Sequence, residues 1–152
     1  MALDRAACRK LALDLLARRE HSRLELQRKL GKRAFSRELI DETLDELEQS
    51  GALSERRFAE SFVSARAAKG QGPVRIRSDL ARRGVDVKHL DELLHDDEFD
   101  WCAIAREARA KRFGGGAPTG YAERVRQARF LQYRGFDMSQ IDAALDIGDN
   151  SD

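Results

Sequence analysis

The sequence predicts an all-α fold made of three tandem three-helix repeats, and three observations support this prediction. Apolar residues recur at helical spacing along the chain, and no segment alternates polar and apolar residues with a period of two. One apolar frame occurs three times, about fifty residues apart. Each copy passes from a basic half into an acidic half. An internal period of this size is typical of repeat proteins, in which each unit buries its apolar face against a neighbour.

The frame has six positions, five of them apolar and one that caps a helix. They are Leu26, Leu30, Phe35, Ser36, Ile40 and Leu44 in the first copy, Ile76, Leu80, Val85, Asp86, Leu90 and Leu94 in the second, and Gln127, Leu131, Phe136, Asp137, Ile141 and Leu145 in the third. Gln127 alone breaks the apolar pattern. We predict repeats at residues 1–51, 52–98 and 99–148, followed by an acidic tail at 149–152.

In the first repeat, residues 4–20 are predicted to form an amphipathic helix with Cys8, Leu11, Ala12, Leu15 and Leu16 on one face. Ser22 and Glu25 form an S-x-x-E capping box that starts the second helix. Ser36 caps a third helix, which ends at Gly51 and has an apolar stripe of Leu39, Ile40, Leu44 and Leu47.

The second repeat opens with Ser54 as the N-cap of a helix that runs through Phe58, Phe62 and Ala65 to Lys69. The Gly-Gln-Gly-Pro sequence at 70–73 breaks this helix, and Pro73 suits the first position of the next one. Asp86 is expected to cap the last helix of this repeat.

The third repeat opens near Asp100, and its first helix is expected to turn Trp101, Ile104, Ala105 and Ala108 inward. The chain pauses at the Gly-rich residues 114–120 and resumes through Val125 to Tyr133. A final helix is expected to begin at Asp137.

Charge is segregated along the chain, although the net charge is only +1. The basic segments 5–33, 55–83 and 101–135 carry net charges of +7, +5 and +6, whereas the acidic segments 34–50, 84–98 and 136–152 each carry −5. Such a chain can present a cationic face to a polyanion or to an acidic groove.

Two equivalent basic helix faces are the first candidate binding surfaces. Arg75 and Arg82 lie seven residues apart, and Arg126 and Tyr133 occupy the same frame positions in the third repeat, with Arg129 beside them. Arginine can neutralise phosphates, while tyrosine can stack on a base or pack on a protein surface. The alternative is an ordinary solvated helix face.

Arginine also occupies one equivalent position in every repeat, at Arg33, Arg83 and Arg134. A cation in the last turn of a helix interacts favourably with the terminal carbonyls and the helix dipole, which is a structural role. Contact with a partner is the alternative. The candidate residues for binding a protein or nucleic-acid partner are Arg66, Lys69, Arg75, Arg77, Arg82, Arg83, Lys111, Arg112, Arg126, Arg129, Tyr133 and Arg134.

The string at 69–76, Lys-Gly-Gln-Gly-Pro-Val-Arg-Ile, is the most specific local motif. It matches neither a Walker loop nor a dinucleotide fingerprint. A glycine C-cap, a short turn and a proline at the start of a helix explain its shape, and a phosphate cradle is the alternative.

The sequence has no signature of an enzyme, a metal site or a cofactor. The acidic run at 96–100 lacks the spacing and central glycine of a calcium loop, and His21, His89 and His95 have no zinc-ligand partners at suitable spacing. No G-x-S-x-G string occurs. We therefore expect no catalytic residues, no metal and no cofactor.

The start of the chain, Met-Ala-Leu-Asp-Arg, lacks the apolar core of a signal peptide. The longest uncharged run, Phe113 to Ala122, is too short for a membrane span. Cys8 and Cys102 are too few for a disulfide framework and are interpreted as small apolar residues. We expect a cytoplasmic monomer that does not bind membranes.

Four sequence motifs, distributed over all three repeats, resemble those of a known protein family. They are Arg18-Arg19-Glu20-His21-Ser22 followed by Glu25-Leu26 and Lys29-Leu30, then Leu53-Ser54-x-x-Arg57-Phe58-Ala59-Glu60-Ser61-Phe62, Gly70-x-Gly72-Pro73-x-Arg75-Ile76, and Arg129-Phe130-Leu131-x-x-Arg134-Gly135-Phe136. Together they resemble the RecX regulatory proteins, and the likeness covers nearly the whole chain.

The resemblance implies an elongated, curved array of three-helix repeats without enzymatic activity. RecX proteins bind the RecA recombinase, lodge in the groove of its filament on single-stranded DNA, and suppress ATP hydrolysis, strand exchange and assistance to LexA cleavage. It therefore implies a negative regulator of RecA in DNA repair, homologous recombination and the SOS response. Single-stranded DNA would be contacted weakly or through RecA.

Two other functions remain open from the residues alone. Three-helix units with a basic second helix resemble helix-turn-helix modules, so direct nucleic-acid binding is one alternative. A helical adaptor for another protein is the second, and in that case the charges would serve solubility.

Overall fold

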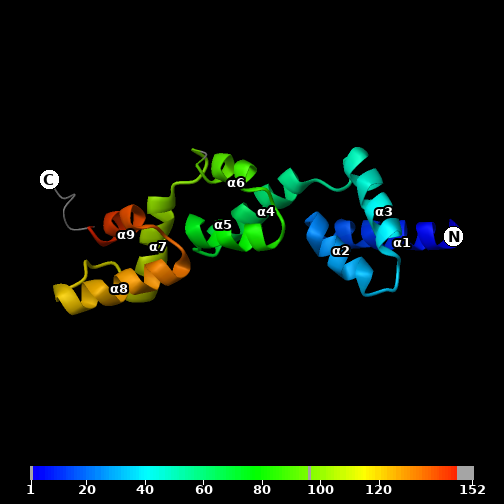
Figure 1. Cartoon of the computed structure of the whole chain (residues 1–152). Coiled ribbons are helices and arrows are strands. Elements are labelled where there is room, and N and C mark those ends of the chain that lie inside the picture. The colour runs from blue at the N-terminus through cyan, green and yellow to red at the C-terminus, as the bar shows by residue number, and fades with distance from the viewer. Residues whose placement is uncertain (1, 96, 147–152) are drawn as a thin grey trace. The chain divides into compact units, whose positions relative to one another are not determined.

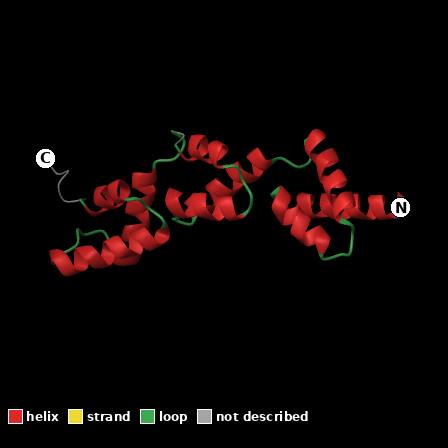
Figure 2. Ribbon diagram, viewed as in Figure 1, coloured by secondary structure: helices red, strands yellow, loops and turns green. Residues whose placement is uncertain are grey.

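Helical periodicity produces nine α-helices and no strand within residues 2–95 and 97–146, the parts of the chain that the computed structural model describes (Figures 1 and 2). The helices are α1 Ala2–Arg18, α2 Arg23–Gly31, α3 Arg37–Gln49, α4 Glu55–Ala68, α5 Pro73–Arg82, α6 Val87–Leu94, α7 Trp101–Phe113, α8 Gly120–Arg134 and α9 Met138–Leu145. The all-α prediction is confirmed. The predicted acidic tail at 149–152 lies outside the described residues.

The nine helices fall into three successive triplets, as the repeated frame predicts, and the chain also divides into two compact units. The first unit comprises Met1–Ser61 and Leu80–His89, and the second comprises Phe62–Asp79 and Leu90–Asp152. The repeat boundaries at 51/52 and 98/99 stay a prediction, because the two units do not follow them.

Short polar side chains start most of these helices, because they satisfy backbone N–H groups that have no partner inside the helix. Ser22 forms the predicted capping box with Glu25, and Asp137 forms a second capping box with Gln140. Side-chain oxygens also accept backbone N–H groups at Ser36, Ser54, Asp86 and Asp100. Every helix start that the sequence assigned to a capping residue therefore has that residue in place.

The core of the first unit contains buried residues of α1, α2 and α3, namely Cys8, Ala12, Leu26, Leu30, Ile40, Leu44 and Leu47, together with Leu53. In the second unit, α7, α8 and α9 enclose Ala105, Ala108, Leu131, Phe136, Ile141, Ala144 and Leu145. The equivalent residues Leu30, Leu80 and Leu131 are all 0% exposed. The apolar positions of the repeated frame are thus core positions, with Phe35 partly buried against the first core.

The helix of residues 55–68 shows a difference in detail from the sequence analysis. Ala65 is exposed, and the buried line along α4 runs through Phe58, Ala59, Val63 and Ala67. Phe62 is half-buried, with the Arg66 guanidinium 4.4 Å from its ring centroid. A cation over the ring lets Phe62 lie at the edge of the core.

The second unit contains a junction between two repeats, where the start of α5 meets the end of α8. The backbone N–H of Gly72 donates to the carbonyl of Arg134 at 2.8 Å, and that of Val74 donates to the carbonyl of Gly135 at 2.9 Å. Both N–H groups are therefore occupied, and the hypothesis that the Gly-Gln-Gly-Pro loop cradles a phosphate is wrong for them. The negative end of one helix dipole also faces the positive end of the other.

This junction requires glycine on both sides. A Cβ on Gly72 would lie 2.4 Å from the carbonyl carbon and oxygen of Gly135, and a Cβ on Gly135 would lie 2.2 Å from the Cβ of Arg75. Gly135 also has φ of +99°, in the left-handed region that only glycine adopts readily. The backbones could not approach this closely with any larger residue.

The same position in the first two repeats shows what the glycine is for. Gly84 has φ of +83°, and in the first unit a Cβ there would meet Leu24 at 3.1 Å. The first repeat has Ala34 at this position, with φ of +63°. Alanine at this left-handed position carries a conformational cost of about 1–2 kcal/mol.

We predict that Leu80→Ala lowers the free energy of unfolding by about 2–5 kcal/mol, because the substitution leaves a cavity in a fully buried site. Denaturant unfolding followed by circular dichroism measures this change. Leu13→Ala is the control and should cost much less, since Leu13 is among the exposed large apolar residues. An unchanged midpoint for Leu80→Ala would contradict the repeated core frame.

We also predict that Gly72→Ala destabilises the protein by about 1–3 kcal/mol, because the added methyl group forces the two backbones of the junction apart. Gly31→Ala is a matched control, since a Cβ at Gly31 meets no atom within 4 Å. The measurement is the thermal unfolding midpoint of each variant. Equal midpoints for the two variants would show that the junction tolerates separation.

Candidate functional site

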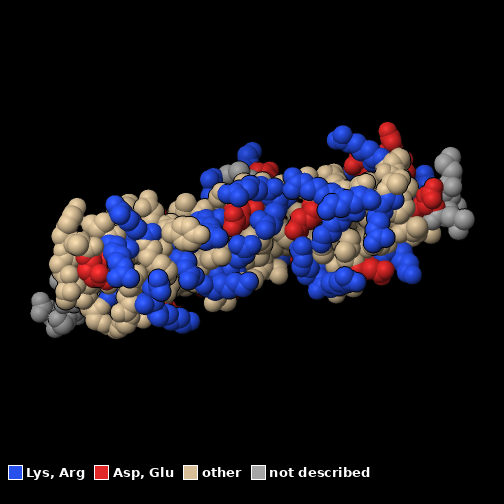
Figure 3. All heavy atoms as spheres, turned by 90° about the horizontal axis from the view of Figure 1, so that it is seen from below, with Lys and Arg blue, Asp and Glu red and all other residues tan. Residues whose placement is uncertain are grey.

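The main candidate surface is a basic face of the second unit. Figure 3 views the structure from the side on which α5 and α8 lie in Figure 1, and Lys and Arg side chains gather over both helices. We use the name "α8 face" for Arg75 of α5 together with Arg126, Arg129 and Tyr133 of α8. The α-helical spacing of 126, 129 and 133 puts these three side chains on one side of α8.

Tyr133 lies in the last turn of α8 and is 76% exposed. The Arg75 guanidinium lies 5.5 Å from the centroid of its ring. Arg75 also has Asp79 one turn along α5, but at 3.9 Å this is a loose ion pair. Arg75 therefore orients the tyrosine ring without being neutralised tightly.

The two other arginines of the α8 face are also open to solvent. Arg126 lies 3.6 Å from Glu123 and 5.5 Å from the centroid of the Phe113 ring. Arg129 is exposed, and it forms no ion pair with any residue in the described part of the chain. Exposed pairs of this kind are weak, so these cations can exchange their contacts for a partner's.

A groove of about 400 Å³ lies in the second unit where the end of α4 approaches α7. Its apolar lining includes Ala67, Ile104 and Ala108, and its charged lining consists of Lys69, Glu107, Lys111, Arg112 and Arg134. Lys111 pairs with Glu107 at 3.3 Å, and Arg134 donates to the Lys69 carbonyl at 3.1 Å. The groove brings four predicted residues together.

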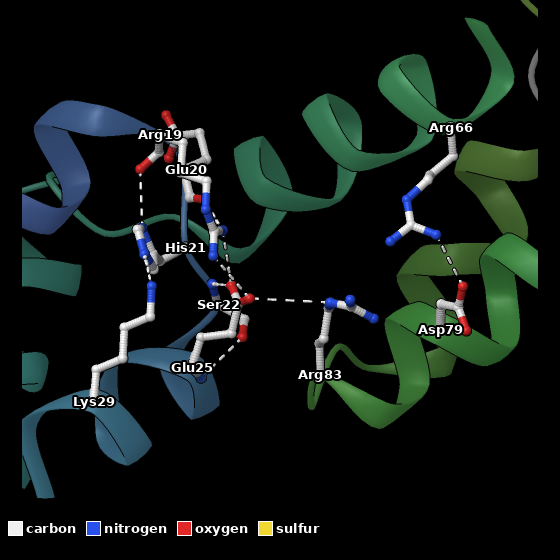
Figure 4. A network of polar contacts seen from close by, with 9 residues as sticks. All are labelled: Arg19, Glu20, His21, Ser22, Glu25, Lys29, Arg66, Asp79 and Arg83. Carbon is white, nitrogen blue, oxygen red and sulfur yellow. Dashed lines mark hydrogen bonds and ion pairs between the residues drawn. The ribbon is translucent and has the colours of Figure 1, made fainter. Parts of the chain in front are cut away.

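Two other predicted residues make close internal contacts. Arg66 bonds to Asp79 and to the Gln71 amide oxygen, each at 3.1 Å, and its side chain is 23% exposed (Figure 4). Arg77 pairs with Asp91 of α6 at 3.0 Å. These contacts give both arginines a role inside the second repeat.

The last two predicted residues lie in the first unit. Arg82 is exposed on the final turn of α5. Arg83 approaches Glu25 at 4.0 Å. Arg83 and Arg134 thus both reach toward the preceding repeat, in addition to lying at the end of their own helices.

Glu25 belongs to a polar network at the start of α2 in the first unit (Figure 4). Burial alone would raise the pKa of its carboxyl, but hydrogen bonds from Arg19 and from the Ser22 amide lower that pKa below the ordinary value. Burial lowers the pKa of the neighbouring His21. Neutral His21 can donate from Nδ1 to the Arg19 carbonyl at 3.0 Å and accept from Lys29 at 2.9 Å through Nε2.

The charge segregation has a structural explanation inside the repeats that sequence reasoning missed. Arg23 pairs with Asp45 at 2.7 Å, and the equivalent Arg124 pairs with Asp146 at 2.8 Å. The acidic stretch of the first repeat is engaged further by Arg5 with Glu42 and Arg9 with Glu46. Part of the basic-to-acidic pattern therefore joins the helices of one repeat.

Arg109 is a second residue that sequence reasoning missed. It is completely buried, and its guanidinium donates to the carbonyls of Gly114 and Gly116. A buried arginine needs such partners, since an unpaired buried charge is strongly unfavourable. Arg109 thus anchors the Gly-rich loop against α7. Arginine at an inward position of a predicted helix is the signal that could have identified it.

The described residues include no group of three or more His, Cys, Asp or Glu side chains that could hold a metal ion. Within the same ranges, no helix combines the length and apolar composition that crossing a membrane requires.

Comparison with known proteins identifies the family. Models of the first, second and third three-helix domains of RecX match residues 8–47, 54–94 and 98–145. The three matches follow one another along the chain in the family's order. They agree with the three helix triplets of the fold.

Curated relatives are similar over nearly their whole length. The chain is 49% identical to "Regulatory protein RecX" of Halorhodospira halophila, over 96% of this chain and 91% of that protein. It is 47% identical to the protein of the same name in Pseudomonas entomophila, over 91% of this chain and 90% of that one.

Solved structures show the same fold at lower sequence identity. The crystal structure of RecX from Lactobacillus salivarius matches with a TM-score of 0.81 at 22% identity, covering 98% of this chain and 99% of that one. A second crystal structure, of a regulatory protein RecX, matches with a TM-score of 0.80 at 19% identity, covering 94% of this chain and 73% of that one. Together with the family models and the curated relatives, these likenesses show that the chain belongs to the RecX family, which consists of regulatory proteins and not of enzymes.

Proposed function

We propose that this chain is a negative regulator of the RecA recombinase. In this proposal it binds in the groove of the RecA filament on single-stranded DNA and inhibits ATP hydrolysis, strand exchange and assistance to LexA cleavage. Membership of the RecX family supports RecA as the partner. The observation that carries the contact mode is the α8 face, where cations with weak internal pairs surround an exposed tyrosine.

The proposed contacts are numerous and individually weak. Exposed cations on several helices can touch acidic groups of the filament protein and phosphates of its DNA, and linked weak contacts add through multivalency. Inhibition follows if the chain bridges neighbouring RecA subunits and binds one filament state better than another. A regulator with equal affinity for both states would shift nothing.

Direct binding of nucleic acid is the second candidate, and the same α8 face favours it, since arginines beside an exposed aromatic ring suit a phosphate backbone with bases. A helical adaptor for another protein would use the groove rimmed by Lys69 and Lys111 instead. The two experiments below separate these possibilities from RecA regulation.

We predict that Arg126→Glu combined with Arg129→Glu weakens binding to the RecA filament by about tenfold, since two exposed charge contacts worth up to about 1 kcal/mol each are lost. Binding is measured by anisotropy of labelled chain on preassembled filament. The control pair, Glu42→Arg with Glu46→Arg, reverses acidic side chains that pair with Arg5 and Arg9. Equal losses from both pairs of substitutions would contradict a specific role of the basic face.

We predict that inhibition of the DNA-dependent ATPase of RecA survives salt concentrations that abolish binding to bare single-stranded DNA. Each phosphate contact to a single strand contributes a slope of about −0.7 to the logarithm of affinity against the logarithm of salt. This slope arises because a phosphate contact releases a counterion from the DNA, and contacts to RecA itself would not release these counterions. Filament assembly is monitored in parallel, so that its loss is not mistaken for loss of inhibition.

The result that contradicts this mechanism is a common salt midpoint. If inhibition and binding to bare DNA disappear together while the filament remains assembled, competition for DNA explains the inhibition better. Binding to bare DNA without any effect of added RecA would favour the direct nucleic-acid binder.

A further inference from the structure

We infer that Tyr133 is a stacking platform for an unpaired base of single-stranded nucleic acid, with Arg75, Arg126 and Arg129 holding the adjacent phosphates. This inference rests on the proposed function and deepens it, because it names the side chain that would contact a base of the single-stranded DNA in the filament. It assigns a different task to the tyrosine than to the arginines around it.

The exposure of Tyr133 is the first argument. At 76% exposed, the ring contributes little to the core of the second unit, although a tyrosine elsewhere in a helix can bury most of its area. The Arg75 guanidinium lies over the ring, 5.5 Å from its centroid, and restricts its orientation. An oriented ring that is mostly open to solvent can accept a flat base with little loss of side-chain freedom.

The charge around the ring is the second argument. Arg129 lies one helical turn before Tyr133, and Arg126 lies two turns before it. Phosphates along a nucleic-acid strand could therefore follow α8 while one base turns toward the ring. The acidic neighbours, Asp79 and Glu123, stand at 3.9 Å and 3.6 Å from their arginines, so their pairs are weak enough to yield to a phosphate.

The surroundings favour nucleic acid over protein as the occupant. A tyrosine at the centre of a protein interface is normally ringed by apolar groups that exclude water. Val74 at the junction and Met138, three residues after Gly135, are exposed apolar residues at 55% and 65%, whereas the other members of the α8 face are arginines. Cations beside an isolated aromatic ring are typical of sites for single-stranded nucleic acid.

The inference distinguishes single strands from duplexes. A base inside a duplex is paired and stacked on both sides, so its face is out of reach of a ring on the surface of a helix. An unpaired base can rotate onto Tyr133 at no cost in pairing. The arginines contact phosphates in either form, so only the tyrosine should contribute to the preference for a single strand.

The experiment compares labelled oligothymidylate with an abasic strand of the same length, using anisotropy and the full chain at low salt. Tyr133→Ala should weaken binding to oligothymidylate by roughly five- to a hundredfold, the effect of losing a base–aromatic stack worth about 1–3 kcal/mol. Its affinity for the abasic strand should stay within twofold of the unsubstituted chain. Tyr133→Phe should bind as the unsubstituted chain does, because stacking does not need the hydroxyl group.

Tyr121→Ala is a matched control, since Tyr121 is even more exposed, at 84%, but lies in the first turn of α8 outside the α8 face. It should leave both affinities unchanged. If Tyr133→Ala weakened binding to oligothymidylate and to the abasic strand equally, the inference would be overturned, because the ring would then only position the arginines. Unchanged affinity of the Tyr133→Ala variant for both strands would overturn the inference as well.

Inhibition of the RecA ATPase by the unsubstituted chain is measured in parallel, and it separates the two proposals. If that inhibition is present while Tyr133→Ala binds oligothymidylate normally, the stacking inference fails and the proposed function stands. If Tyr133→Ala weakens binding to the RecA filament but not to oligothymidylate, the ring contacts RecA and not a base, which also overturns the inference. Absence of inhibition by the unsubstituted chain would instead overturn the proposed function.

Discussion

The close approach of backbones at the junction between repeats is the constraint on which the second unit depends. Gly72 offers no capping side chain to the first turn of α5, so its own N–H and that of Val74 require other acceptors. The last carbonyls of α8 and Gly135 supply them, at 2.8 Å and 2.9 Å. Two helix ends thereby satisfy each other, and the glycines are needed because any Cβ would hold the two ends apart. The groove and the α8 face both depend on this placement, since Arg134 lines the groove, Arg75 belongs to the α8 face, and both residues lie at the junction.

The junction in the first unit uses the same positions with different chemistry. Ser22 stands where the second repeat has Gly72, and its capping box with Glu25 satisfies the backbone N–H groups of Ser22 and Glu25. Side chains therefore make the connection: Glu25 approaches Arg83 at 4.0 Å, and Glu20 pairs with Arg57 at 3.0 Å. Arg57 also donates to the carbonyl of Gly51, at 2.6 Å. One junction is thus built from backbone hydrogen bonds and the other from charged side chains.

Most of the fold could be predicted because its signals are local. Caps such as Ser22 and Asp137, and buried frame residues such as Leu80, act within a few residues of one another, so a single sequence displays them. The candidate site was less predictable, because exposure and pairing are decided by residues far away in the sequence. Nothing near Arg23 identifies Asp45 as its partner, and nothing near Arg134 identifies the Lys69 carbonyl. The absence of catalytic signatures, by contrast, agrees with a family of regulatory proteins.

The distribution of paired and open cations then bears on how a regulator of this kind could work. The acidic third helix of the first repeat is engaged by Arg5, Arg9 and Arg23, so much of the segregated charge there is neutralised within the unit. Among the described residues of the third repeat, Arg124 pairs with Asp146, whereas Arg129 is exposed and lies in none of the ion pairs. A partner gains most from cations that it does not have to detach from an acidic neighbour. Arg28 and Arg33 of the first repeat are likewise exposed and lie in none of the ion pairs of the described residues, so the first repeat and the α8 face both offer open cations to a partner.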